Sequence, residues 1–274
     1  MVPSIMLNNG VEIPQLGFGV FQIDRGDTAA AVRAALDAGY RHIDTAQMYG
    51  NEREVGQAIA ESGIPRDEIF VTTKLNNDRH GHDDAIKALD ESLDKLGSDH
   101  VDLYLIHWPR PKENRFVETW KAFEELQSDG RTRAIGVSNF QIPHLERLAA
   151  ETATVPAVNQ VELHPRFPQA ELRAYHREHG IATEAWSPIG GQGSDLLSEP
   201  ALQSLASKYG KTPAQIVLRW HIQLGDIVIP KSVTPSRIKE NIDVFDFELE
   251  PGDMDAVDAL NTGERKGPDP DDFG

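Results

Sequence analysis

The sequence predicts an α/β fold in which eight strand-then-helix units close into a (β/α)8 (TIM) barrel, with an N-terminal β-hairpin ahead of the first unit. Short apolar runs alternate with longer segments whose apolar residues recur at helical spacing. Regular alternation implies a parallel sheet, and eight units imply closure rather than an open sheet. No linker or composition shift divides the chain, so we expect a single domain over residues 1–274.

The elements follow in order. The hairpin is predicted from two short runs, SIML and VEIP, around Asn8-Asn9-Gly10, because Asn-Gly between apolar runs favours a tight turn. Strands are expected at residues 16–20, 41–46, 69–75, 101–108, 134–139, 157–163, 182–186 and 227–232. The first helix is expected to begin at Asp27 or Thr28 and to be capped at Gly39. Further helices are expected at residues 52–62, 86–96, 117–127, 143–150, 170–179, 201–209, 213–224 and 237–243. The tail from Thr262 should be irregular and cover one mouth of the barrel.

Composition narrows the class of protein. The net charge of -17 argues against a nucleic-acid partner or an anionic membrane surface, and the absence of cysteine excludes disulfides and thiolate sites. There is no apolar run of about 18 residues and no basic-then-apolar leader. We therefore expect a soluble, cytoplasmic protein, and nothing in the sequence demands more than a monomer.

Polar and ionisable side chains gather at the C-terminal ends of the predicted strands, where a barrel of this kind has its active site. They are Asp44, Lys74, His107, Ser138, Asn139, Gln160, Trp186, Ser187, Lys231 and Ser232, with residues 17–20 at the first strand. Taken alone, each has an ordinary structural explanation, such as a rim lysine or a hydrogen-bonded core histidine. Their concentration at one mouth, with complementary charges, favours catalysis.

Four of these positions suggest acid–base chemistry. A phenol is a weak acid near neutrality, so we expect the Lys74 ammonium to lower the pKa of Tyr49 and Asp44 to keep Lys74 charged. Tyr49 could then protonate an oxygen on which negative charge builds, while His107 orients that oxygen. The set contains no nucleophile, so another reagent must attack the carbon.

Residues 229–241, IPKSVTPSRIKEN, suggest that reagent. Lys231, Arg237 and Lys239 gather with hydroxyl side chains at a strand-to-helix junction, a ready site for an anion although a solvated helix start is the ordinary alternative. Trp186 offers a flat face to an aromatic ring. The side chains that could read an amide are Ser138, Asn139 and Gln160. Together they describe a nicotinamide dinucleotide.

The chain resembles the aldo-keto reductases. The matching stretches are LGFGV, DTAQMYGNE, TTKL, LYLIHWP, GVSNF, NQVELHP and IPKSVTPSRIKEN, and they run in order through nearly the whole chain. The short loop after His107 and the stretch AWSPIGGQG look most like the bacterial 2,5-diketo-D-gluconate reductase branch. The resemblance implies NADPH as the cofactor and reduction of a small-molecule carbonyl substrate to an alcohol.

The resemblance also implies residue roles. Asp44, Tyr49, Lys74 and His107 match the catalytic tetrad, with Tyr49 as proton donor. Cofactor contacts are implied at Gly19, Val20, Phe21, Asp44, Ser138, Asn139, Gln160, Trp186, Ser187, Ile189, Lys231, Ser232, Val233, Thr234, Arg237, Glu240 and Asn241. The substrate pocket is implied at Phe21, Met48, Tyr49, Asn76, His107 and Trp108. No metal site is expected: His80 and His82 are interpreted as solvent-facing loop residues.

Some positions depart from the family pattern. Trp186 stands where Tyr is frequent, Phe21 stands where Trp is common, and Gly190-Gly191 replaces a hydroxyl of the pyrophosphate clasp. Two other functions stay open: a redox sensor that holds NADPH with negligible turnover, and a barrel hydrolase or isomerase that binds a sugar phosphate near Lys231. The pocket residues leave aldehydes, α-diketones and keto sugars open as substrates.

Overall fold

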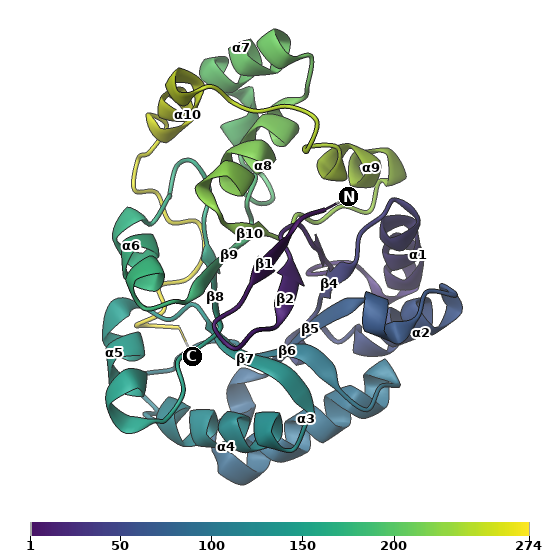
Figure 1. Ribbon diagram of the computed structural model, residues 1–274, viewed down its shortest axis with the longest axis vertical. Helices are drawn as coiled ribbons and strands as arrows, with labels where there is room; N and C mark the ends of the chain where they lie inside the picture. Colours follow the sequence, from purple (N-terminus) through teal and green to yellow (C-terminus); the bar gives the residue numbers. More distant parts are fainter. Residues whose placement is uncertain (1, 274) are drawn as a thin grey trace.

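A parallel eight-stranded sheet forms the centre of the computed structural model, which describes residues 2–273 (Figure 1). Its strands are β3 (Phe18–Gly19), β4 (His42–Asp44), β5 (Phe70–Leu75), β6 (Val101–Ile106), β7 (Thr132–Ser138), β8 (Val158–Glu162), β9 (Ala182–Trp186) and β10 (Ile227–Val228). The first and last strands meet through a parallel bridge between Leu16 and Val228, and the amide of Gly17 donates to the carbonyl of Val228 at 2.8 Å. This closure confirms the predicted (β/α)8 barrel.

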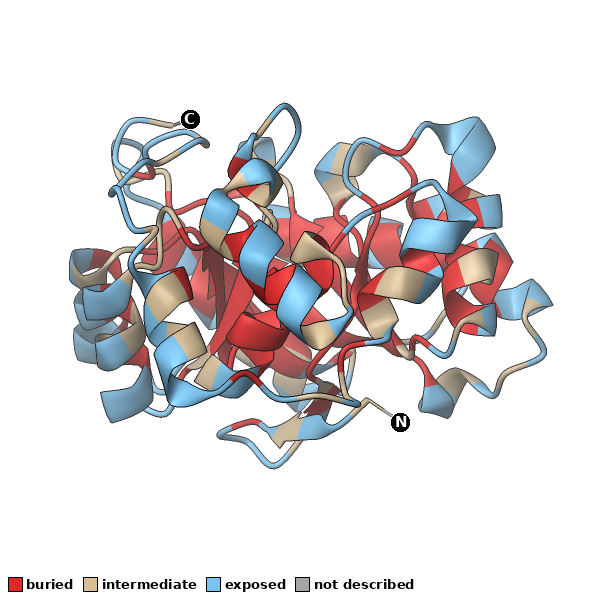
Figure 2. Ribbon diagram, turned by 90° about the horizontal axis from the view of Figure 1, so that it is seen from above, coloured by how far each residue is buried: buried red, intermediate tan, exposed pale blue. Residues whose placement is uncertain are grey.

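The helices surround the sheet. They are α1 (Arg25–Asp37), α2 (Glu52–Glu61), α3 (His82–Leu96), α4 (Phe116–Ser128), α5 (Ile142–Glu151), α6 (Ala170–Glu178), α7 (Pro200–Tyr209), α8 (Pro213–Leu224), α9 (Pro235–Ile242) and α10 (Pro251–Asp258). Figure 2 shows the buried strands at the centre and the exposed faces of the helices outside. No helix within residues 2–273 is both long and apolar enough to cross a membrane.

The predicted hairpin closes one end of the barrel. Strands β1 (Ser4–Met6) and β2 (Glu12–Pro14) pair antiparallel, and the side chain of Asn9 donates to the carbonyl of Arg133 at 3.0 Å, next to the start of β7. Leu7 and Ile13 are buried against the barrel interior. The N-terminus and the C-terminal tail lie on opposite faces (Figure 2). The far mouth, at the C-terminal ends of the strands, is therefore free for a site.

Several boundaries differ from the prediction. The last strand ends at Val228 because Pro230 has no N–H to donate to a sheet. Helix α1 begins at Arg25, before both proposed caps, and the hydroxyl of Thr28 donates back to the carbonyl of Asp24 at 2.9 Å. Helix α10 is not predicted by the sequence pattern, because it buries only Val257 and so lacks an apolar stripe.

Candidate active site

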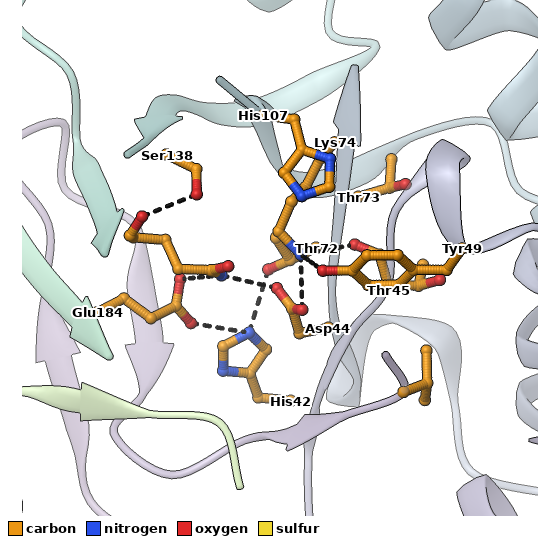
Figure 3. A network of polar contacts seen from close by, with 12 residues as sticks. His42, Asp44, Thr45, Tyr49, Thr72, Thr73, Lys74, His107, Ser138 and Glu184 are labelled. Atoms are coloured by element: carbon orange, nitrogen blue, oxygen red, sulfur yellow. Dashed lines mark hydrogen bonds and ion pairs between the residues drawn. The ribbon is translucent and has the colours of Figure 1, made fainter. Parts of the chain in front are cut away.

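The Lys74 ammonium group lies at the centre of the candidate site (Figure 3). Its Nζ donates to Asp44 Oδ1 at 2.7 Å, to the Thr45 carbonyl at 2.9 Å and to the Tyr49 hydroxyl at 3.2 Å. Asp44 is the last residue of β4, and Lys74 lies near the end of the neighbouring β5, so parallel pairing brings both to one mouth. The structure thus brings together the predicted carboxylate, ammonium group and phenol.

The ion pair between Asp44 and Lys74 is buried. Burial by itself would lower the pKa of Lys74, but the Asp44 carboxylate and the Tyr49 oxygen outweigh it and raise the pKa to about 12. The ammonium group therefore stays charged at neutral pH. All three of its N–H groups have acceptors, which a buried charge requires.

Tyr49 ends the short 3-10 helix η1 (Gln47–Tyr49) that follows β4. Its ring is half-buried, with its centroid 5.0 Å from that of Phe21 and 5.7 Å from that of His107. Gly50 ends this turn with a left-handed φ of 70°. The loop therefore directs the hydroxyl group inward onto Lys74.

Our expectation of an acidified Tyr49 is wrong for this structure. Burial raises the pKa of the phenol above its ordinary value of 10.0, and the Lys74 charge opposes this shift without overcoming it. Desolvation was not visible in the sequence, because it depends on how closely Phe21, His107 and Lys74 pack around the ring. The phenol consequently keeps its proton throughout the neutral range.

His107 follows β6 and points into the same mouth. It is buried, and burial together with the nearby Lys74 charge lowers its pKa well below 6.5. The imidazole is therefore neutral at neutral pH and has one N–H to donate. That state suits the predicted role, since a neutral donor can hold a substrate oxygen without protonating it.

Beneath these four side chains lies a polar network that the sequence pattern did not predict. Gln160 Nε2 donates to Asp44 Oδ2 at 2.8 Å and to Glu184 Oε2 at 2.9 Å. On the other side of Glu184, His42 Nε2 lies 3.7 Å from Oε1 and 3.1 Å from Thr72 Oγ1 (Figure 3). One sequence signal could have revealed this network: Glu184 is an acidic residue in the middle of ATEAW, a predicted strand.

The residues expected to read a carboxamide meet at the ends of β7, β8 and β9. Ser138 Oγ donates to the Gln160 carbonyl at 2.7 Å, and Asn139 Nδ2 donates to the His107 carbonyl at 2.9 Å. Trp186 Nε1 donates to Asn139 Oδ1 at 2.8 Å. Most of their donors are therefore already used within the protein, which fixes these side chains in place and leaves mainly acceptor atoms for an amide.

The predicted phosphate end lies in the loop between β10 and α9. Lys231 and Arg237 are exposed, and neither has a carboxylate within ion-pair distance among residues 2–273. Unpaired cations are notable in a chain of net charge -17. Thr234 stands at the N-cap of α9, and the buried hydroxyl of Ser232 accepts its amide at 3.1 Å. These residues fit an anionic ligand.

Other predicted cofactor contacts fall around this loop. Val233 is exposed, and Asn241 is buried. The Glu240 carboxylate accepts from Thr212 Oγ1 at 2.7 Å.

The remaining predicted cofactor contacts lie after β9 and at the end of β3. Ser187 has a left-handed φ of 50° in the loop after β9, and Ile189 packs against the core. Gly19 and Val20 are buried at the end of the first strand; a Cβ at Gly19 would lie 3.0 Å from the Ile229 carbonyl.

The predicted substrate-pocket residues lie on the other side of the mouth. Phe21 and Met48 are exposed beside Tyr49. The side chain of Asn76 accepts from the Asn77 amide at 2.9 Å and so caps a turn. Trp108 is buried, with its ring centroid 4.5 Å from that of Phe273 in the C-terminal tail. Phe273 thus places an aromatic side chain of the tail beside the predicted pocket residues.

The Glu162 carboxylate fixes that tail over the mouth. Glu162 ends β8, and its two oxygens accept the amides of Lys266 at 2.6 Å and Gly267 at 2.7 Å. A Cβ at Gly267 would lie 2.4 Å from the Trp186 ring, so only glycine permits this approach. The tail is irregular, as expected, and lies against the ends of β8 and β9 at one side of the mouth.

The interpretation of His80 as a solvent-facing loop residue is wrong. His80 is buried rather than solvent-facing, whereas His82 is partly exposed and begins α3. Burial, together with the nearby Arg110 and Arg115 charges, lowers the pKa of His80 to about 4. Among residues 2–273, no cluster of three or more potential ligands could hold a metal ion.

A buried ammonium group joins a carboxylate to a phenol, beside a neutral imidazole, at the mouth of a (β/α)8 barrel. Such a set of groups can transfer a proton to an oxygen. Residues 15–262 match the model of the Aldo/keto reductase family. The chain belongs to this family.

Its relatives agree over nearly the whole length. An aldo-keto reductase of Mycolicibacterium smegmatis is 59% identical over 270 residues, which cover 98% of each chain. The methylglyoxal reductase DkgA of Escherichia coli (strain K12) is 50% identical over 270 residues, again 98% of each chain. The crystal structure of a Gox0644 mutant in complex with NADPH superimposes with a TM-score of 0.95 at 45% identity, covering 100% of this chain and 99% of that one.

Proposed function

We propose that the protein reduces carbonyl compounds to alcohols with NADPH and that Tyr49 is the general acid. The observation that carries the proposal is the hydrogen bond from Lys74 Nζ to the Tyr49 hydroxyl at 3.2 Å, with Asp44 holding the same ammonium at 2.7 Å. The fit of the unpaired cations to an anion, and the NADPH complex of the Gox0644 relative, support the cofactor assignment.

When bound, the nicotinamide ring supplies a hydride to the carbonyl carbon. The chain's own residues handle the oxygen. His107 donates its single N–H and orients the carbonyl, and Tyr49 gives up its proton as negative charge develops there. The Lys74 charge stabilises the phenolate that remains, and Asp44 keeps that ammonium in position. Trp186, Asn139 and Gln160 would hold the ring and its carboxamide, and the loop that begins at Lys231 would hold the phosphates.

The substrate class is the second part of the proposal. We infer that small carbonyls with a vicinal oxygen, such as methylglyoxal, are reduced well, because DkgA carries that activity in its name. The pocket side presents aromatic and aliphatic surfaces from Phe21, Met48 and Trp108, with few charges. Simple aldehydes and keto sugars are the alternatives.

A carbonyl panel tests the function. NADPH consumption should be measured with methylglyoxal, a simple aldehyde and 2,5-diketo-D-gluconate, alongside fluorescence titration of NADPH without substrate. We expect saturable binding and turnover, fastest with methylglyoxal. Tight binding with no turnover on any substrate would instead support a redox sensor. Absence of binding would support a sugar-phosphate hydrolase or isomerase and would overturn the proposal.

Cofactor preference provides a separate prediction. Arg237→Ala should weaken NADPH binding by about 10- to 100-fold, because a hydrogen bond to a charged group contributes about 1.5–3 kcal/mol. NADH binding should change little, since NADH lacks the 2′-phosphate that we propose Arg237 binds. Arg177→Ala removes the same charge from an exposed position on α6 and serves as the control. Equal weakening of both cofactors by Arg237→Ala would contradict a 2′-phosphate clamp.

A further inference from the structure

Glu184 is a second carboxyl group beneath the tetrad, and the proposed reaction does not use it. It lies in the middle of β9, is fully buried and faces Asp44 across the barrel through one shared amide nitrogen, Gln160 Nε2. Each hydrogen of that amide goes to one of the two carboxyl groups. The other oxygen of Glu184, Oε1, has no hydrogen-bond partner among residues 2–273.

The charges around this network do not balance if both acids are ionised. The titratable groups that face Glu184 are His42 and Asp44 from β4 and Lys74 from β5, with Tyr49 beyond Lys74. The paired strands add no charge there: β8 contributes the neutral Gln160, and β10 contributes Ile227 and Val228. Burial lowers the pKa of His42 to about 4, so Lys74 is the single cation of this set at neutral pH.

One ammonium can compensate one carboxylate, and Asp44 holds it at 2.7 Å. A second ionised carboxylate would be a buried charge without a cation, which is strongly unfavourable. Burial and then the Asp44 charge raise the pKa of Glu184 to about 8. At neutral pH its proton can lie on Oε1, towards His42 Nε2 at 3.7 Å.

We propose that Glu184 is a positioning residue that supports the proton donor: it holds a proton at neutral pH, and once ionised its negative charge keeps the Tyr49 phenol protonated. The proposal rests on the role given to Tyr49 in the proposed function. As pH rises, Glu184 loses its proton before Tyr49 does, and the new charge near Lys74 makes a phenolate harder to form. Glu184 would thereby extend the donor state of Tyr49 to higher pH.

The first test needs neither cofactor nor substrate. The folded-state pKa of Glu184 is raised from 4.5 to about 8, so the stability from its bound proton is complete below pH 4.5 and lost as pH rises to about 8. Glu184→Gln keeps the shape of the neutral acid and lacks this loss. We expect urea unfolding to show the variant gaining stability relative to wild type across that range. A constant difference, or a relative loss, would overturn the proposal.

The second test reads the coupling to Tyr49. In Glu184→Gln the alkaline limb of kcat/KM for carbonyl reduction should move down by about one pH unit, because a buried charge nearby shifts a pKa by about that amount. Glu52→Gln makes the same change in a buried carboxylate that contacts Thr73 and Lys95 instead, and its limb should stay in place. An unmoved limb in Glu184→Gln would overturn the coupling.

Infrared spectra of the unmodified protein test the protonation of Glu184 even if the Glu184→Gln variant does not fold. We expect a protonated carboxyl C=O band at neutral pH that disappears on the alkaline side of Glu184's titration. Absence of the band at neutral pH would overturn the proposal. If no carbonyl is ever reduced, the proposed function fails, whereas the unfolding and infrared results still decide whether Glu184 holds a proton.

Discussion

Tyr49→Phe should lower kcat for carbonyl reduction by about 10²- to 10⁴-fold, the range that a general acid contributes. The change removes the hydroxyl that accepts from Lys74 at 3.2 Å and leaves the ring against Phe21 and His107. Cofactor binding should be nearly intact, because the proposed NADPH contacts lie elsewhere. Steady-state NADPH consumption and fluorescence titration measure the two effects separately.

Tyr104→Phe is the matched control. Tyr104 is fully buried in β6, its ring stacks on Phe123 with centroids 4.3 Å apart, and its hydroxyl makes no hydrogen bond among residues 2–273. Its loss should leave both turnover and stability close to wild type. Reduction by Tyr49→Phe at the rate of this control would remove Tyr49 from the role of proton donor.

Lys74→Met should have the second large effect, on stability as well as on turnover. Methionine fills the space but leaves the buried Asp44 without its cation, and breaking one side of a buried pair costs about 3–5 kcal/mol. Urea unfolding of the cofactor-free protein measures this cost. Turnover should fall as well, because no charge would remain to stabilise the Tyr49 phenolate.

The double variant Asp44→Asn/Lys74→Met separates the loss of stability from the loss of turnover. Removing the orphaned carboxylate should recover much of the lost stability, because a neutral amide costs far less to bury than an unpaired charge. Turnover should stay low, since the ammonium is still missing. Recovery of activity together with stability would show that Lys74 serves the fold rather than the chemistry.

The barrel and the positions of its reactive groups could be predicted from the chain alone. Apolar runs of strand length between amphipathic segments require a parallel sheet, and the residues at their C-terminal ends must then meet at one mouth. Asp44 and Lys74 were found this way, and their contact at 2.7 Å confirms the expected partner for the carboxylate. The hairpin could also be predicted from a local signal, because Asn9-Gly10 favours its tight turn.

The local pattern of the chain was enough to predict which chemical groups the strands carry, and at which end of the barrel they lie. Their protonation states depend on the folded interior: burial raises the pKa of Tyr49 instead of lowering it, and Glu184 faces Asp44 from a strand far along the chain. The physical reason is that a local pattern fixes the direction of a side chain, whereas desolvation and charge repulsion depend on every neighbour that packs around it.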